Sequence, residues 1–129
     1  YRLMDKEEIY ELSNNRFFTI GAHGHNGVGL DSVPNHIARK EVAVNKQILE
    51  EITGNKIEYF SYPGHLHWSN GGSKEIENIL NRMGFKAAFG NFYAAVYPED
   101  DELNNYNIPR IKVGNFHPYL FFQLLKRFF

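Results

Sequence analysis

The stretch that decides the fold is residues 17–26, Phe17-Phe18-Thr19-Ile20-Gly21-Ala22-His23-Gly24-His25-Asn26. Aromatic and β-branched residues over 17–20 predict a short buried strand, which ends at Gly21. The loop that follows, residues 22–29, carries two histidines between glycines. In parallel sheets flanked by helices, the loops at the carboxyl ends of the strands carry the functional groups. This loop is therefore the first candidate for a functional site.

Helix and strand patterns alternate after this loop. Ser32 is suited to cap a helix and Gly54 to end it, and apolar residues recur between them at spacings of seven, four and four. We expect this stripe, which consists of Ile37, Val44, Ile48 and Ile52, to be buried. The other expected elements are helices over 5–12, 73–84 and from Pro118 onward, and strands over 57–62, 85–89 and 110–113. Such alternation with short links predicts an α/β fold with a parallel sheet flanked by helices.

The composition fits one globular domain over residues 1–129. Apolar residues make up 43% of the chain and aromatic residues 16%, which is enough for a packed core. The formal net charge is -1 and basic residues do not cluster, so no nucleic-acid partner is expected. The apolar stretch over 119–125 is shorter than the roughly 20 residues of a transmembrane helix. Because the chain has no cysteine, any metal site must use His, Asp or Glu.

Two groups of residues suit ligand binding. His23 and His25 follow a strand end, where neutral imidazoles suit a divalent metal such as zinc; the alternative is that they are polar loop residues that bond backbone or water. Residue type alone leaves both interpretations open. The second group follows the expected strand over 57–62 and combines aromatic and polar side chains, which suits the face of a sugar, with ordinary packing and solvation as the alternative. Its members are Tyr62, Pro63, His65 and Trp68.

Residues 3–113 as a whole resemble the polysaccharide deacetylase family, the NodB-like group also called carbohydrate esterase family 4. The resemblance rests on four strings and on their order along the chain. They are Leu3-Met4 with the helix to Leu12, Ile20-Gly21-Ala22-His23 with Leu30, Lys40-Glu41 with residues 48–54, and Phe60-Ser61-Tyr62-Pro63-Gly64 with residues 83–88. The string Pro109-Arg110-Ile111 is also similar to a C-terminal strand in some branches of the family.

The resemblance implies a fold, a chemistry and a site. The fold would be the C-terminal part of a partial (β/α) barrel of the polysaccharide deacetylase type, with its N-terminal strand missing. In the family, one Asp and two His hold a metal, usually zinc, and a second Asp is the general base in the removal of acetyl groups from carbohydrates. The resemblance assigns the metal to His23 and His25, and the substrate groove to Tyr62, Pro63, His65 and Trp68.

Two departures from the family's pattern bear on activity. The family's Asp-Asp pair lies on an earlier strand, so the metal Asp and the catalytic base are not among these residues. The second metal histidine stands four residues after the first, where this chain has Gly27. We therefore expect zinc to be weakly held or absent in this chain. The expected function is a metal-dependent deacetylase of amino sugars or polysaccharides; the alternative is a catalytically inactive carbohydrate-binding relative.

Three further expectations concern single features. Arg110 is expected to bridge a strand and a loop, because arginine is rarely buried without a partner; the alternative is that it bonds a carboxylate in the site. A carbohydrate is the expected partner, and an open sheet edge predicts association with a second copy of the chain. The sequence does not choose between a bacterial cell envelope and the cytoplasm.

Overall fold

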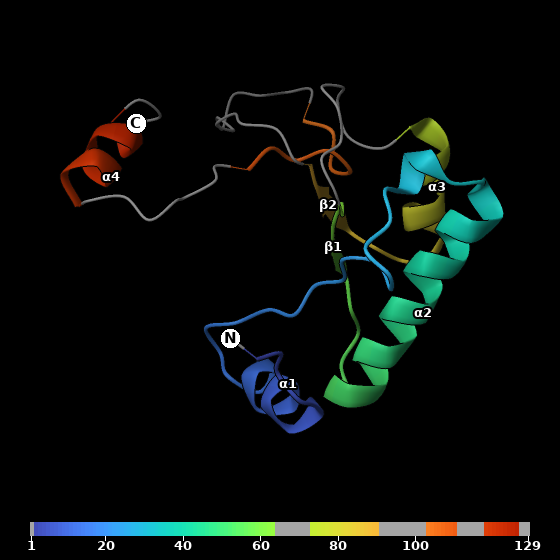
Figure 1. Cartoon of the computed structure of the whole chain (residues 1–129), viewed down its shortest axis with the longest axis horizontal. Helices are drawn as coiled ribbons and strands as arrows, with labels where there is room; N and C mark the ends of the chain where they lie inside the picture. The colour runs from blue at the N-terminus through green and yellow to red at the C-terminus, as the bar shows by residue number, and fades with distance from the viewer. Residues whose placement is uncertain (1, 64–72, 91–102, 111–117, 127–129) are drawn as a thin grey trace.

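The computed structural model describes residues 2–63, 73–90, 103–110 and 118–126 (Figure 1). Its centre is a parallel sheet of two strands, β1 (Tyr59–Ser61) and β2 (Ala87–Phe89). Ala22 pairs with Phe60 of β1, and Ile108 pairs with Phe89 of β2, both in parallel orientation. The segments at Ala22 and Ile108 therefore add one row on each side of the two strands, and the four rows follow one another in chain order. The expected parallel α/β arrangement is confirmed. A barrel is not confirmed, because the rows in the described ranges form an open sheet.

The first expected strand is displaced towards the carboxyl end. Phe17 is 77% exposed and Phe18 is exposed too, so residues 17–20 are not the buried strand that their composition predicts. The contact with the sheet is instead made at Ala22, two residues past the expected end. Residues 111–113 of the last expected strand lie outside the described residues, and the fourth row pairs at Ile108. Association with a second copy through the sheet edge stays a prediction.

Four α-helices lie within the described ranges, and each confirms an expected helix. They are α1 (Lys6–Ser13), α2 (Asn35–Thr53), α3 (Lys74–Arg82) and α4 (Pro118–Leu125), with a short 3-10 helix at Leu30–Ser32. Ser32 does not cap α2, which begins after Pro34. Gly54 ends α2 as expected, because its φ of 69° is a left-handed conformation that glycine adopts readily, and its N–H donates to the carbonyl of Glu50.

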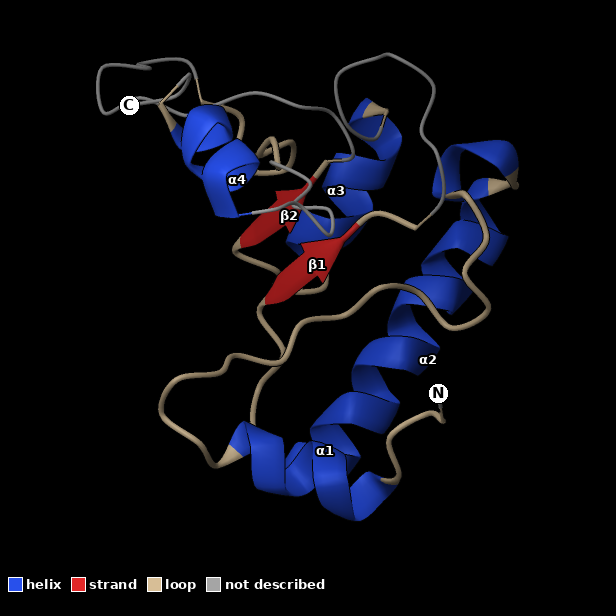
Figure 2. Cartoon of the chain, turned by 60° about the vertical axis from the view of Figure 1, so that its left-hand side comes forward, coloured by secondary structure: helices blue, strands red, loops and turns tan. Residues whose placement is uncertain are grey.

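The helices are distributed unevenly around the sheet. Figure 2 shows α2 and α3 beside β1 and β2, whereas α1 packs against the carboxyl end of α2. In Figure 1, α4 stands apart from the other helices, and its Tyr119 and Phe122 are exposed. Among the residues that can be described, no helix combines the length and the apolarity needed to cross a membrane.

One hydrophobic core joins the sheet to α2 and α3. Phe60 of β1 is 1% exposed and makes edge-to-face contacts with Tyr62 and Phe85, with ring centroids 5.5 Å apart in both pairs. Such geometry is favoured by the quadrupole of aromatic rings. The other buried members of this core are Ala22, Leu30, Ala38, Val42, Ile57, Ile76, Ile79, Leu80 and Ala88. Burial of this apolar surface is the main stabilising contribution to the fold.

The buried face of α2 is not the isoleucine stripe. Ile48 is 36% exposed and Ile37 is exposed to a similar extent, so the prediction that this stripe faces the sheet is wrong. The residues that the structure buries are Ala38, Glu41, Val42 and Thr53. A helix with two apolar stripes can bury either one, and here the buried stripe is the one that also carries a carboxylate. That carboxylate lies next to the histidine loop, as described below.

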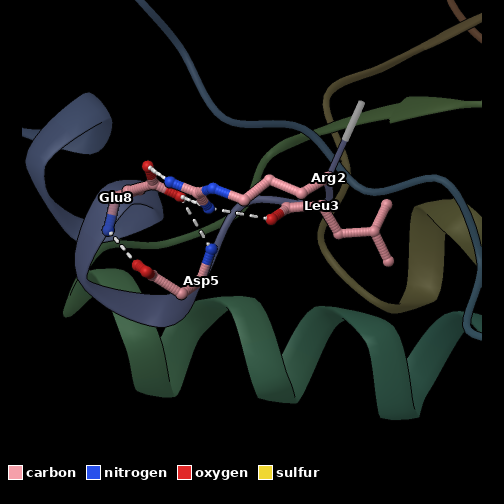
Figure 3. A network of polar contacts seen from close by, with 4 residues as sticks. All are labelled: Arg2, Leu3, Asp5 and Glu8. Carbon is pink, nitrogen blue, oxygen red and sulfur yellow. Dashed lines mark hydrogen bonds and ion pairs between the residues drawn. The ribbon is translucent and has the colours of Figure 1, made fainter.

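Helix α1 begins with a capping box that an arginine extends (Figure 3). The Asp5 carboxylate accepts the backbone N–H of Glu8 at 2.9 Å, and the Glu8 carboxylate accepts the backbone N–H of Asp5 at 2.9 Å. Arg2 donates to both oxygens of Glu8, at 2.5 and 2.7 Å. The guanidinium of Arg2, and then the Asp5 amide, hold the pKa of Glu8 below its usual range. Reciprocal caps of this kind satisfy amide groups that the first turn leaves free.

The lowered pKa of Glu8 predicts an acid dependence of stability. A carboxyl group with a lowered pKa in the folded state stabilises the fold above its unfolded pKa, and this contribution is lost as the pH falls through the folded pKa. Glu8→Gln keeps the capping box and removes the charge that Arg2 contacts. We expect a smaller loss of Tm for the variant than for the wild type between about pH 6 and about pH 3, measured by far-UV circular dichroism. Parallel Tm curves would contradict this role.

Candidate functional site

His23 lies at the carboxyl end of the row that pairs with β1. The N–H of Ala22 donates to the carbonyl of Tyr59 at 2.8 Å, and the N–H of Ser61 donates to the carbonyl of Ala22 at 2.8 Å. These two bonds fix the register of the row, so that His23 follows directly beside Ser61. The expectation that His23 stands at the end of a parallel row is confirmed.

The imidazole of His23 is oriented by a backbone carbonyl. Its Nδ1 lies 2.8 Å from the carbonyl oxygen of Ser61. Because a carbonyl oxygen only accepts hydrogen bonds, Nδ1 is the donor in this contact, and in the neutral ring Nε2 then has the lone pair. Metal-binding histidines have this arrangement, in which one ring nitrogen is held by a carbonyl and the other is available as a ligand. His23 is exposed, so Nε2 is accessible.

Arg110 connects the strand ends around His23. Its Nε donates to the carbonyl of Gly90 at 2.6 Å, and its NH1 group donates to the hydroxyl of Ser61 at 2.7 Å. Gly90 directly follows β2 and Ser61 ends β1, so one guanidinium joins the ends of two strands. The expected bridging role of Arg110 is confirmed. Because Ser61 also holds the imidazole of His23, the arginine acts on the orientation of that ring through Ser61.

An open cleft of about 600 Å³ lies against the sheet at this end. Side chains alternate across a strand, and in β1 the buried Phe60 is flanked by the half-buried Tyr59 and Ser61. The cleft is lined by Thr19, Gly21, Ala22, His23, Tyr59, Phe60, Ser61 and Phe89. Its lining is mostly apolar with a few polar groups, which is typical of small-molecule sites.

The histidine loop, residues 23–26, is anchored on α2. The carboxylate of Glu41 accepts the backbone N–H of Asn26 at 2.7 Å and its side-chain amide at 2.6 Å. One turn further along α2, the side-chain oxygen of Asn45 accepts the backbone N–H of His23 at 3.0 Å. The Asn26 backbone N–H, then its side chain, and to a smaller extent His25 hold the pKa of Glu41 below its usual range. This carboxyl group is therefore ionised at neutral pH.

A metal site was expected around His23 and His25. His23 fits the role of a ligand, because its Nδ1 is bonded to a carbonyl and its Nε2 retains a lone pair. His25 lies close enough to Glu41 to affect the pKa of that carboxylate. Within the ranges that the structure describes, no three His, Asp or Glu side chains come together in a way that could hold a metal ion. The assignment of His23 and His25 to a metal stays a prediction.

Comparison with known proteins identifies the relatives of this chain. The family model described as polysaccharide deacetylase matches residues 3–88. The chain belongs to the polysaccharide deacetylase family. A solved structure, that of IcaB from Ammonifex degensii, has a TM-score of 0.69 and 22% sequence identity, and the alignment covers 94% of this chain and 51% of that one. This likeness shows a shared fold, and the chain spans about half the length of that protein. No curated protein matches the chain.

The family's groove string is partly described here. Tyr62 is 1% exposed, and its hydroxyl donates to the carbonyl of Tyr106 at 3.0 Å; Pro63 is also buried. This burial indicates a packing role for both residues and argues against their direct contact with a substrate. His65 and Trp68, the other two residues assigned to the groove, lie outside the described residues.

Three site residues were missed by sequence reasoning. Ser61 and Glu41 belong to strings that resemble the family, and Asn45 lies within an expected helix, but no role was predicted for any of them. The signal that could have found the latter pair is their spacing of four residues, which places two polar groups on one face of α2. Their partners, His23 and Asn26, come from a loop that precedes the helix, so the pairing itself requires the fold.

Proposed function

We propose that the protein containing this chain is a metal-dependent deacetylase that removes acetyl groups from amino sugars or polysaccharides. Membership of the polysaccharide deacetylase family supports the reaction class. The single observation that carries the proposal is the imidazole of His23, whose Nδ1 is held by the Ser61 carbonyl while Nε2 keeps a lone pair beside an open cleft. In this proposal residues 1–129 form part of one deacetylase domain whose Asp-Asp pair lies on a preceding strand.

Each described site residue has a distinct task in this proposal. When bound, a divalent ion such as zinc polarises the acetyl carbonyl and activates water for its hydrolysis. His23 would bind the ion through Nε2, and His25 would be the second histidine. Ser61 sets the tautomer and the direction of the His23 ring, and Arg110 in turn fixes Ser61. The cleft beside His23 would admit the acetylated sugar.

Gly27 favours a second candidate function. It occupies the position where the family has its second metal histidine, and a glycine has no side chain to offer. A relative with an incomplete metal site would bind carbohydrate without hydrolysing its acetyl groups. Fold alone does not choose between these functions, because one fold supports different activities.

The two functions are separated by measuring acetate release and glycan binding on the full-length protein with zinc. We expect the wild type to release acetate from N-acetylated chitooligosaccharides, and His23→Ala to lower kcat/KM on the order of 100-fold or more, because the metal loses its best oriented ligand. His36→Ala is the control, because this exposed histidine lies in the first turn of α2 and outside the cleft lining.

Three outcomes are informative. Glycan binding without acetate release would favour the inactive relative. Equal kcat/KM for wild type and His23→Ala would remove His23 from the site. A similar loss in His36→Ala would show that the effect of His23→Ala is not specific to the cleft.

A further inference from the structure

Two polar side chains of α2 face the histidine loop from successive turns. Glu41 is 8% exposed although it carries a carboxylate, and Asn45 is half-buried. Both oxygens of Glu41 are used by Asn26, and the side-chain oxygen of Asn45 is used by the backbone of His23. Burial of a carboxylate is unfavourable unless its oxygens accept hydrogen bonds. The burial of Glu41 therefore requires the donors of the histidine loop, and the loop in turn is held in place by Glu41.

We propose that Glu41 and Asn45 are positioning residues, which hold the backbone of the histidine loop so that His23 and His25 are presented to a divalent cation. Neither residue contacts the ligand in this proposal. The cation part rests on the proposed function, whereas the effect on the His23 ring is a statement about the folded chain alone.

The backbone contacts explain why such positioning is needed. Residues 23–26 contain Gly24, and a loop of this kind has many conformations to lose when it is ordered. The bond from His23 N–H to Asn45 fixes the start of the loop, and the two bonds from Asn26 to Glu41 fix its end. The carbonyl of Ser61 holds the ring of His23 at the same time. The backbone of His23 is thus fixed by α2, and its ring is fixed by β1.

A purely structural role for Glu41 is the competing explanation, and the chain contains a matched control for it. Glu77 of α3 is 7% exposed. Its carboxylate accepts a hydrogen bond from the side-chain amide of Asn104 at 2.5 Å and forms an ion pair with Lys74 at 3.2 Å. It is a buried helical glutamate bonded to an asparagine, as Glu41 is. The two named partners of Glu77 lie outside the histidine loop. Replacing Glu77 therefore measures the structural effect of removing a buried carboxylate without disturbing that loop.

The test combines a spectroscopic signature with metal affinity. The ¹⁵N resonances of the His23 ring in the 129-residue chain, recorded at about pH 8 where imidazole is neutral, report which nitrogen carries the proton. We expect the wild type to hold the proton on Nδ1. Glu41→Leu and Asn45→Leu should convert this single state into a mixture of tautomers, whereas Glu77→Leu should leave it unchanged. Asn45→Leu keeps the test open if Glu41→Leu does not fold.

A conservative variant should restore the signature. Glu41→Gln retains one acceptor, and a rotated Asn26 amide can accept from the new side-chain NH₂ group, so both contacts can be rebuilt. We expect Glu41→Gln to resemble the wild type. The proposal is overturned if Glu41→Leu and Asn45→Leu both keep the wild-type tautomer, or if Glu77→Leu changes it equally.

Titration calorimetry of the full-length protein with zinc chloride then tests the cation part. Loss of a residue that orients a metal ligand typically lowers metal affinity by about 10–100-fold, and we expect this for Glu41→Leu but not for Glu77→Leu. Equal affinity in wild type and Glu41→Leu would overturn the cation part. A full-length wild-type protein that binds no zinc would count against the proposed function, whereas the ring signature would still decide the positioning role of Glu41 and Asn45.

Discussion

Phe60→Ala should lower the free energy of unfolding by about 3–5 kcal/mol, the usual cost of truncating a buried phenylalanine. Phe60 is in the middle of β1, fully buried, and contacts the rings of Tyr62 and Phe85. Its removal would leave a cavity between the sheet and the helices and would also remove both edge-to-face contacts. Because stabilities of small domains are about 5–15 kcal/mol, this substitution removes a large part of the total. Urea denaturation monitored by circular dichroism measures it.

Phe17→Ala is the matched control for this prediction. It removes the same side chain from a residue that is mostly exposed, so the expected change is within about 0.5 kcal/mol. Comparable losses in both variants would mean that the core is not centred on β1. The pair therefore tests the displacement of the first row from residues 17–20 to Ala22.

Gly27→His should raise the zinc affinity of the chain by at least about tenfold, because it adds an imidazole where the family has its second metal histidine. The backbone has room for the side chain, since a Cβ at Gly27 would meet no atom within 4 Å. The φ of +70° is unfavourable for a residue other than glycine, and we expect a cost of about 1–2 kcal/mol to the stability of the metal-free chain. Calorimetric titration with zinc and thermal unfolding with and without zinc measure the two effects.

Gly27→Ala separates strain from metal binding, because it adds the same Cβ without an imidazole. Both variants should lose similar stability without zinc. With zinc at about 100 times the Kd of Gly27→His, this variant should regain about 2.7 kcal/mol, whereas Gly27→Ala, with an affinity at least about tenfold lower, should regain at most about 1.4 kcal/mol. If the two variants respond to zinc alike, residue 27 does not face the metal and the position of the site is wrong.

The sequence predicted which elements form better than which surfaces they bury. The end of α2 at Gly54 and the helices over 5–12, 73–84 and from Pro118 onward are predicted from local signals, and the structure confirms them. The strand over 17–20 was misplaced, because aromatic residues favour a strand whether or not neighbouring rows are present to cover them. The pairing that moved the row to Ala22 is made with β1, far along the chain, and composition does not reveal it.

The buried face of α2 shows a similar limit. Periodicity identified an apolar stripe through Ile48, but Ala38 and Val42 lie on a second face that is apolar as well. The buried face also carries Glu41, whose carboxylate is acceptable inside because Asn26 supplies two donors. A hydrophobicity pattern counts such a glutamate as a surface residue, so it favours the other face.

The candidate site was predictable where one residue type carries the chemistry. His23 followed from a histidine at an expected strand end, and Arg110 followed from the need of an arginine for partners. The contacts that orient His23 come from the carbonyl of Ser61 and the amide of Asn45. A carbonyl is present in every residue, so no sequence pattern distinguishes the one that will meet an imidazole.

The polar contacts of α2 also determine how the helix can sit on the sheet. Apolar contacts have no preferred direction, so a helix held by them alone could rotate to bury a neighbouring stripe at modest cost. A rotation of about 100°, the angle between successive residues of a helix, would separate the carboxylate of Glu41 from both donors of Asn26 and break the two hydrogen bonds that anchor the loop. The two alternative orientations of α2 are thus made unequal in energy, and a sequence with two similar apolar faces specifies a single native arrangement.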